Sequence, residues 1–119
     1  MNKKYMSWDK FEEGCQLLAK QIKKSDTEIK TIFGIPRGGL CIAVRLSHIL
    51  SIPMIKNFSY VNKNTLIVDD IADSGKTLSG FNSKYNKATL HYKPESSIIK
   101  PDFFAYKTKS WIVYPWEKK

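Results

Sequence analysis

The sequence predicts an α/β protein in which a parallel β-sheet is flanked by helices. Amphipathic helical segments alternate along the chain with short runs rich in β-branched residues, and one of these runs is apolar at successive positions. No repeat or low-complexity tract interrupts the alternation. The chain has 119 residues, 42% of them hydrophobic, which suits one packed core, so we expect residues 1–119 to form a single domain.

The first half of the chain predicts two helices and two strands. Ser7 is a suitable N-cap for a helix over 8–24, whose apolar residues recur at helical spacing. The short apolar run Thr31–Ile35 predicts a strand, and Leu40–Leu50 predicts a second helix before a proline. The segment Met54–Tyr60 is expected to be another strand.

The second half continues the same alternation. The run Thr65–Asp69 contains three consecutive apolar residues, a pattern typical of a strand buried on both faces. A helix over 77–84 and strands over Ala88–Tyr92 and Phe103–Tyr106 are expected to follow. In such parallel sheets ligands bind beyond the carboxyl ends of the strands, which directs attention to the loops found there.

Charge and cysteine content exclude some classes of function. The net charge of +9 attracts anions, but 18 of the 20 basic residues are lysine, which argues against base-specific reading of nucleic acid. A nucleic-acid-binding protein is therefore the last-ranked hypothesis. No apolar run reaches the roughly 20 residues of a membrane span, and the first residues do not form a signal peptide. Cys15 and Cys41 fit neither a disulfide framework nor a metal site, so we expect a cytoplasmic protein.

The most informative segment is the end of the third predicted strand and the loop after it. Asp69 and Asp70 stand side by side there, and Asp73 and the run 74–77 (Ser-Gly-Lys-Thr) follow. Adjacent carboxylates repel each other unless ribose hydroxyls or hydrated Mg²⁺ offset their charge. The loop supplies hydroxyls and backbone N–H groups at a helix start, which together suit a terminal phosphate. The segment therefore predicts a site for a phosphorylated ribose.

Two other interpretations of this segment are weaker. Asp69 and Asp70 alone would be ordinary turn and cap residues, but the whole run 65–77 suits one chemistry. Its end also matches the end of a P-loop. The glycine required earlier in that motif would fall at Asp70, whose carboxylate repels phosphate, so we reject the P-loop.

Residues 65–77 resemble the ribose-phosphate signature of the type I phosphoribosyltransferases. Four more segments resemble, in order, the bacterial xanthine–guanine (6-oxopurine) phosphoribosyltransferases of that family: Tyr5–Asp9, Ile35–Leu40, Lys93-Pro94 and Trp111–Glu117. The resemblance covers nearly the whole chain. It implies a single-domain, Rossmann-like parallel sheet with flanking helices and a small C-terminal hood that binds the base.

The resemblance also implies a reaction and a cofactor. Members of the family use Mg²⁺, transfer ribose 5-phosphate from 5-phosphoribosyl 1-pyrophosphate (PRPP) to N9 of a purine, and release pyrophosphate. Asp69 and Asp70 are implied to hold the ribose hydroxyls, directly or through Mg²⁺ and water, and Asp73 to act at N7 of the purine as general acid or base. The residues implied for the 5′-phosphate are Asp73, Ser74, Gly75, Lys76 and Thr77, and those for pyrophosphate are Arg37, Gly38 and Gly39.

Recognition of the purine is implied for three residues near the C-terminal end. Lys93 matches a lysine that donates to the 6-oxo group, Trp111 would stack on the ring, and the Ile112 backbone would bond to its edge. Singly, Lys93 would be read as a solvated lysine and Trp111 as a core aromatic, so only their joint order favours a purine site. Val113 stands where relatives often carry a polar or acidic residue, which leaves the choice among hypoxanthine, guanine and xanthine open.

The chain departs from the family in one loop. Relatives carry a long mobile loop before the ribose-phosphate strand, whereas only Val61–Asn64 separate Tyr60 from Thr65 here. Four residues are too few for a lid that excludes water. Two functions stay open: an active purine phosphoribosyltransferase of purine salvage, and a catalytically weak or inactive regulatory module that binds PRPP or a nucleotide. The resemblance also implies a homo-oligomer, either a dimer or a tetramer.

Overall fold

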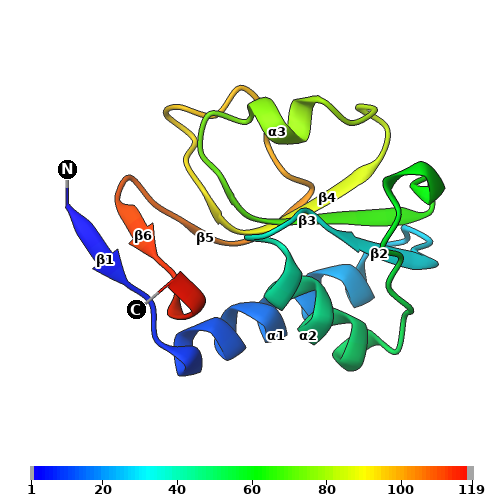
Figure 1. The fold of residues 1–119 in the computed structure, drawn as a ribbon, viewed down its shortest axis with the longest axis horizontal. Coiled ribbons are helices and arrows are strands. Elements are labelled where there is room, and N and C mark those ends of the chain that lie inside the picture. The colour runs from blue at the N-terminus through cyan, green and yellow to red at the C-terminus, as the bar shows by residue number, and fades with distance from the viewer. Residues whose placement is uncertain (1, 118–119) are drawn as a thin grey trace.

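A four-stranded parallel sheet forms the centre of the protein, and the predicted α/β class is confirmed. The computed structural model describes residues 2–117. The strands lie in the order β2 (Thr31–Gly34), β3 (Thr65–Ala72), β4 (Asn86–Tyr92) and β5 (Phe103–Lys107). Figure 1 shows α1 (Trp8–Lys24) and α2 (Leu40–Leu50) on one face of this sheet and the single turn α3 (Lys76–Ser79) on the other.

Helices α1 and α2 have the bounds that the sequence predicts. The side chain of Ser7 accepts a hydrogen bond of 3.0 Å from the backbone N–H of Lys10, which caps α1. Helix α2 ends at Leu50 and is followed by the C-cap Ser51, whose backbone adopts the left-handed conformation with φ 55°. No helix among residues 2–117 is long and apolar enough to cross a lipid bilayer.

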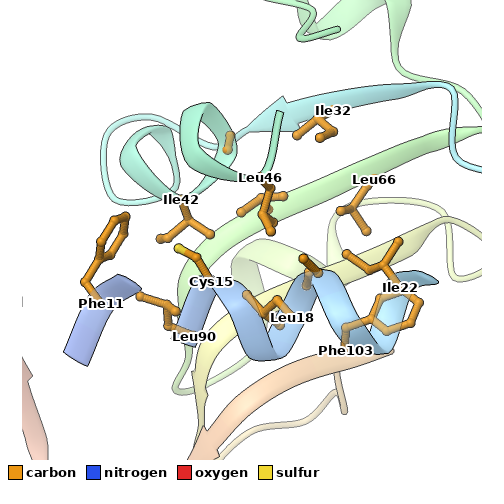
Figure 2. Packing of buried hydrophobic residues seen from close by; sticks show 14 of the residues in the cluster. Phe11, Cys15, Leu18, Ile22, Ile32, Ile42, Leu46, Leu66, Leu90 and Phe103 are labelled. Carbon is orange, nitrogen blue, oxygen red and sulfur yellow. The ribbon is translucent and has the colours of Figure 1, made fainter. Parts of the chain in front are cut away.

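The main core lies between these two helices and the sheet. Figure 2 shows the apolar face of α1, with Cys15 and Leu18, directed toward Leu46 of α2 and the strand residues Leu66 and Leu90. Each of these five side chains is fully buried. Burying one such side chain contributes about 1.5–3 kcal/mol for the larger aliphatic residues. This core fixes the sheet, and so it fixes the ends of the strands that carry the functional loops.

A second, two-stranded sheet joins segments from near both ends of the described chain. Strand β1 (Lys3–Tyr5) pairs in parallel with β6 (Trp111–Val113), and the 3₁₀ turn η2 (Pro115–Glu117) follows. The sequence predicts neither strand, because three residues are too few to show a periodic pattern. This sheet and turn form the predicted small hood, placed beside the main sheet in Figure 1.

Three predicted elements differ most, and the strands predicted over 31–35, 88–92 and 103–106 differ by one or two residues at one end. Met54–Tyr60 is not a strand: Met54 forms one isolated bridge, and Phe58–Tyr60 is a 3₁₀ turn capped by the side chain of Asn57. The helix predicted over 77–84 is only α3, since a new turn begins at Asn82, whose side chain accepts the N–H of Lys84. Strand β3 continues past its predicted end at residue 69 to residue 72.

Candidate active site

The two adjacent acids lie inside strand β3 rather than beyond its end. The register of β3 with β4 pairs Asp69 with Thr89 and then passes over Asp70 to the next pair. Val68 and Ile71 pack on the same core although they are three residues apart, whereas regular alternation would place them on opposite faces. The alternation is therefore broken at the acid pair, where the backbone N–H of Asp70 donates to Asp69 Oδ1 at 2.9 Å.

Burial governs the electrostatics of this pair. It raises the pKa of the Asp69 carboxyl, and the neighbouring charge of Asp70 raises it further. Burial also raises the pKa of Asp70, whereas hydrogen bonds from Asp69 and from the N–H of Ile71 act in the opposite direction. The Ile71 N–H donates to Asp70 Oδ1 at 2.8 Å. Two partly buried acids that resist full ionisation suit a site where hydroxyl donors or a cation complete their surroundings.

The loop after β2 lies against these acids. A Cβ added at Gly38 would lie only 2.7 Å from Cγ of Asp70, and one added at Gly39 would collide with the carbonyl oxygen of Val68. Glycine is therefore required at both positions by close approach of the chain. Arg37 is exposed at the surface of this loop, and the peptide bond that precedes it is cis. The predicted pyrophosphate loop thus contacts the acid pair, and the backbone of Gly38 lies beside the carboxyl group of Asp70.

The predicted phosphate loop follows β3 directly. Asp73, Ser74, Lys76 and Thr77 are all exposed, while Gly75 is buried with φ +82°. A Cβ on Gly75 would lie 2.6 Å from Oγ of a neighbouring serine, so the loop approaches another segment closely. Because α3 is a single turn, its dipole is small, and its first N–H group, that of Lys76, donates to Oγ of Ser74 at 3.3 Å, so the hydroxyl and this N–H lie together at the start of the turn.

A cavity of about 120 Å³ opens where the hood meets the main sheet. It is lined by Asp70, Ile71, Asp73, Lys93, Trp111, Ile112, Tyr114 and Glu117. Lys93 is 7% exposed, and its Nζ lies 3.4 Å from Oδ2 of Asp73. Trp111 is 53% exposed, which leaves much of its ring accessible for stacking, whereas Trp116 packs against the core and stacks on Tyr114.

The pairing of β1 with β6 decides which backbone groups face this cavity. The N–H of Trp111 donates to Asn2 at 3.0 Å, and the carbonyl of Val113 accepts from the N–H of Met6 at 2.9 Å. In a parallel ladder alternate residues of a strand bond to the same neighbour, so the N–H and C=O of Ile112 point away from β1. Ile112 lines the cavity, and its backbone can therefore offer one donor and one acceptor to a planar ring.

Two cavity residues, Tyr114 and Glu117, are not identified by any sequence pattern as site residues. The buried hydroxyl of Tyr114 donates to the carbonyl of Asp70 at 3.1 Å and lies 2.9 Å from Nδ1 of His91. Burial, and then the charge of Asp70, raise the pKa of Tyr114, so the hydroxyl keeps its proton and acts as a donor. Glu117 Oε1 accepts the N–H of Tyr114 at 2.8 Å. Their position after Trp111 in the C-terminal segment is the only sequence signal for them.

The segment before β3 forms a tight turn. The Asn62 side chain accepts the N–H of Asn64 at 2.8 Å, and the Asn62 carbonyl accepts the N–H of Thr65 at 3.0 Å. Just before it, the ring of Phe58 packs 5.4 Å from that of Phe81, between ring centroids. This segment is therefore folded onto the protein by short contacts, in agreement with the expectation that four residues do not make a lid.

The structure brings most of the predicted site residues together. Asp70, Asp73, Lys93, Trp111 and Ile112 share one cavity, Asp69 and Gly38 contact Asp70, and Ser74 to Thr77 continue from Asp73. The described residues contain no group of three or more His, Cys, Asp or Glu that could hold a metal ion by themselves. Mg²⁺ commonly binds through one or two carboxylates together with substrate phosphates, so the acid pair fits a metal carried in with its substrate.

Comparison with known proteins gives consistent relatives. The chain is 32% identical to the purine phosphoribosyltransferase of Pyrococcus horikoshii Ot3, with a TM-score of 0.82 over all of this chain and 97% of that one. It is 27% identical over 143 positions to the xanthine-guanine phosphoribosyltransferase of Cereibacter sphaeroides, covering 95% of this chain and 86% of that protein.

A further likeness concerns the fold alone. The xanthine-guanine-hypoxanthine phosphoribosyltransferase of Helicobacter pylori superposes with a TM-score of 0.84 at 24% identity, over 98% of this chain and 94% of that one. No family model matches the sequence. The alignment of 143 positions with the Cereibacter protein exceeds the 119 residues of this chain, so that relative carries insertions with respect to it.

Proposed function

Because the chain belongs to the purine phosphoribosyltransferase family, we propose that it transfers the 5-phosphoribosyl group of PRPP to N9 of a 6-oxopurine in purine salvage. The observation that carries this proposal is the cavity in which Asp70 of the main sheet faces Trp111 and Ile112 of the hood. Such a cavity suits a ribose on one side and a planar base on the other. We further propose that residues 1–119 act as one domain.

The first chemical task is to separate C1′ of the ribose from pyrophosphate. The electron pair of the C1′–O bond leaves with pyrophosphate, and positive charge develops on the sugar. The carboxylates of Asp69 and Asp70 would stabilise that charge and hold the ribose hydroxyls. Arg37 and the backbone N–H groups of the adjacent glycine loop would stabilise the leaving group.

The second task is to place the base and remove its proton. The lone pair of N9 forms the new bond to C1′, and the proton carried on N7 passes to the carboxylate of Asp73. Lys93, held 3.4 Å from Asp73, would donate to the 6-oxo group. Trp111 would stack on the ring, and the outward N–H and C=O of Ile112 would bond to its edge. Placement of this kind supplies much of the rate enhancement in transfers with little covalent chemistry.

A magnesium ion would be held by Asp69 and Asp70 together with the substrate. When bound, it would neutralise charge on the pyrophosphate oxygens. The chemistry of the donor pair supports this assignment, since both groups are carboxyls and burial disfavours two bare charges there.

The test is a transfer assay with PRPP and Mg²⁺, using hypoxanthine, guanine and xanthine in turn. The double variant Asp69→Asn/Asp70→Asn is expected to lose at least roughly 100-fold in kcat/KM, because it removes the charges that face the sugar. The matched control is Asp26→Asn, an exposed carboxyl in the loop after α1, which is expected to keep full activity. Absence of nucleotide product with all three bases would reject the transferase.

The relatives do not favour the alternative of a catalytically weak regulatory module. The three proteins compared above are all named as phosphoribosyltransferases. The short link Val61–Asn64 is the observation that motivated it. Calorimetry separates the two, because a regulatory module would bind PRPP or nucleotide tightly and show no turnover in the same preparation.

We also propose a homo-oligomer. An apolar groove of about 360 Å³ between α1 and α2 leaves Trp8, Leu40 and Val44 exposed by 55%, 40% and 44%. A second copy of the chain packing on this groove would cover them. Light scattering after size exclusion is expected to show a dimer or tetramer, and Val44→Glu to yield a monomer, with Ser83→Glu as control. The free thiols of Cys15 and Cys41 support a cytoplasmic location for this assembly.

A further inference from the structure

One hydroxyl group connects the hood to the strand that carries the acids. Tyr114 follows β6 directly, and its hydroxyl donates to the backbone carbonyl of Asp70, which is 44 positions away in sequence. The ring of Tyr114 is only 2% exposed and stacks on Trp116, with ring centroids 5.0 Å apart and an interplanar angle of 7°. The contact therefore joins two parts of the proposed site through a side chain whose own orientation is fixed by packing.

The imidazole of His91 holds the same hydroxyl from the other side. His91 lies on β4, is 6% exposed, and its Nδ1 is 2.9 Å from the Tyr114 oxygen. A carbonyl can only accept, so the single hydroxyl proton of Tyr114 points to Asp70. The tyrosine oxygen must then accept a hydrogen bond from His91, which requires the tautomer protonated on Nδ1. The three groups form one directed chain, from imidazole to hydroxyl to carbonyl.

The carbonyl at the end of this chain belongs to a residue that the registers of β3 pair with neither β2 nor β4. Asp70 is passed over in the register of β3 with β4, and the last residue pair of β2 with β3 is formed by Val68. The tyrosine hydroxyl thus supports the backbone of Asp70 where the β-ladder pairing is interrupted. The same Asp70 lines the cavity beside Ile112 of the hood.

We propose that Tyr114, held by His91, is a positioning residue that fixes the base-binding hood against the ribose-binding strand. This inference rests on the proposed function and deepens it. The bond that forms in the reaction joins a base held by the hood to a sugar held by β3, so their relative position must be set by a contact that spans the two. The Tyr114 hydroxyl makes such a contact, and both of its hydrogen-bond partners, His91 and the carbonyl of Asp70, are protein groups.

Ligands of different length distinguish a positioning role of Tyr114 from a merely structural one. Inosine 5′-monophosphate spans both parts of the site, whereas ribose 5-phosphate reaches only the strand and the phosphate loop. If the hood loses its link, a smaller fraction of molecules holds the two parts in register, and only the spanning ligand is affected. Loss of one hydrogen bond predicts an affinity about fivefold weaker for inosine 5′-monophosphate.

The experiment is calorimetric titration of the full chain with these two ligands. Tyr114→Phe keeps the stacked ring and removes only the hydroxyl, so it is expected to weaken inosine 5′-monophosphate about fivefold and to leave ribose 5-phosphate unchanged within twofold. In the transfer assay the same variant is expected to raise the KM for hypoxanthine while the KM for PRPP stays constant. The matched control is Tyr106→Phe, since Tyr106 also lies beside His91 but its hydroxyl bonds to Glu13.

A second pair of variants tests the imidazole end of the chain. His91→Leu removes the donor and is expected to weaken the spanning ligand at least twofold, while His91→Gln keeps an N–H donor and is expected to restore wild-type affinity. If Tyr114→Phe does not fold, the two His91 variants decide whether the positioning role holds: it is overturned if His91→Leu binds inosine 5′-monophosphate as tightly as wild type.

The outcomes separate the two proposals. Failure of the wild-type protein to bind inosine 5′-monophosphate would reject the proposed function itself. With wild-type binding intact, the positioning role is overturned if Tyr114→Phe leaves the nucleotide affinity unchanged, if both ligands weaken equally, or if Tyr106→Phe causes the same loss.

Discussion

Alanine at Gly38 is expected to damage the site while the fold persists. The added Cβ would lie 2.7 Å from Cγ and 3.0 Å from Oδ1 of Asp70, so the carboxyl group must rotate away. Rotation breaks the 2.8 Å bond from the N–H of Ile71 to Asp70 Oδ1, which predicts a loss of about 1 kcal/mol in the free energy of unfolding. Displacing a catalytic group by about 1 Å lowers turnover by roughly 100-fold.

The neighbouring glycine provides the contrast that makes this prediction sharp. A Cβ at Gly39 would meet backbone atoms only, including N and O of Ile35 at 2.9 and 3.0 Å and the carbonyl of Val68. Backbone atoms cannot rotate away, so Gly39→Ala is expected to cost more than about 3 kcal/mol of stability. Gly80→Ala is the control, because Gly80 has a helical φ of −72° and its nearest contact would be 3.3 Å.

Urea unfolding and the transfer assay, run on the same preparations, check these three variants. The expected pattern is a small stability loss with a large activity loss for Gly38→Ala, a large stability loss for Gly39→Ala, and a change within about 0.5 kcal/mol for Gly80→Ala. The reasoning is refuted if Gly38→Ala keeps more than half of the wild-type turnover, or if it loses as much stability as Gly39→Ala.

Three further predictions concern titration, an ion pair and metal. Burial lowers the pKa of His91 from 6.5 to about 4, so as the pH falls the unfolded chain binds a proton on His91 before the folded protein does. The difference in the free energy of unfolding between wild type and His91→Gln, measured in urea, is therefore expected to shift against wild type by about 3 kcal/mol between pH 7 and pH 4. Two hydrogen bonds of 2.7 and 2.8 Å join Arg45 to Glu12 and hold the pKa of Glu12 down at about 2, so Arg45→Met is expected to lower the stability modestly at pH 7, and this loss is expected to fade as the pH falls toward 2, where Glu12 protonates. Chelation with EDTA is expected to abolish turnover but not to shift the melting temperature, because Asp69 and Asp70 would hold Mg²⁺ only with substrate.

The elements that could be predicted are those whose sequence carries a local signal. Helix 8–24 has an N-cap at Ser7 and a regular apolar face, and Leu40–Leu50 is followed by a proline, so local chemistry sets both. The prediction of a strand over Met54–Tyr60 was wrong. Its residue types favour a strand, but the Asn57 side chain accepts the N–H of Ser59 and stabilises a 3₁₀ turn instead. A local pattern of apolar residues does not reveal such a cap.

The candidate site divides in the same way. The acid pair, the loop after β2 and the loop after β3 are each a short continuous stretch of sequence, so residue type and order alone identify each of them. The contact of Tyr114 with Asp70 and His91 depends on three separate elements meeting, and no local pattern predicts it. Likewise, the outward backbone groups of Ile112 follow from a pairing between β1 and β6, which lie at opposite ends of the described chain.

The pairing of β1 with β6 has a consequence for how the molecule matures on the ribosome. The segments that would hold the sugar and its phosphate end at residue 77, and Ser96 and Ile98, which bond to Asp73 and Ser74, also precede the hood, whereas the hood closes only when Trp111–Val113 emerges and meets Lys3–Tyr5. Contacts of such long sequence separation form late. A nascent chain is therefore expected to bind a phosphorylated sugar before it can discriminate one nucleobase from another.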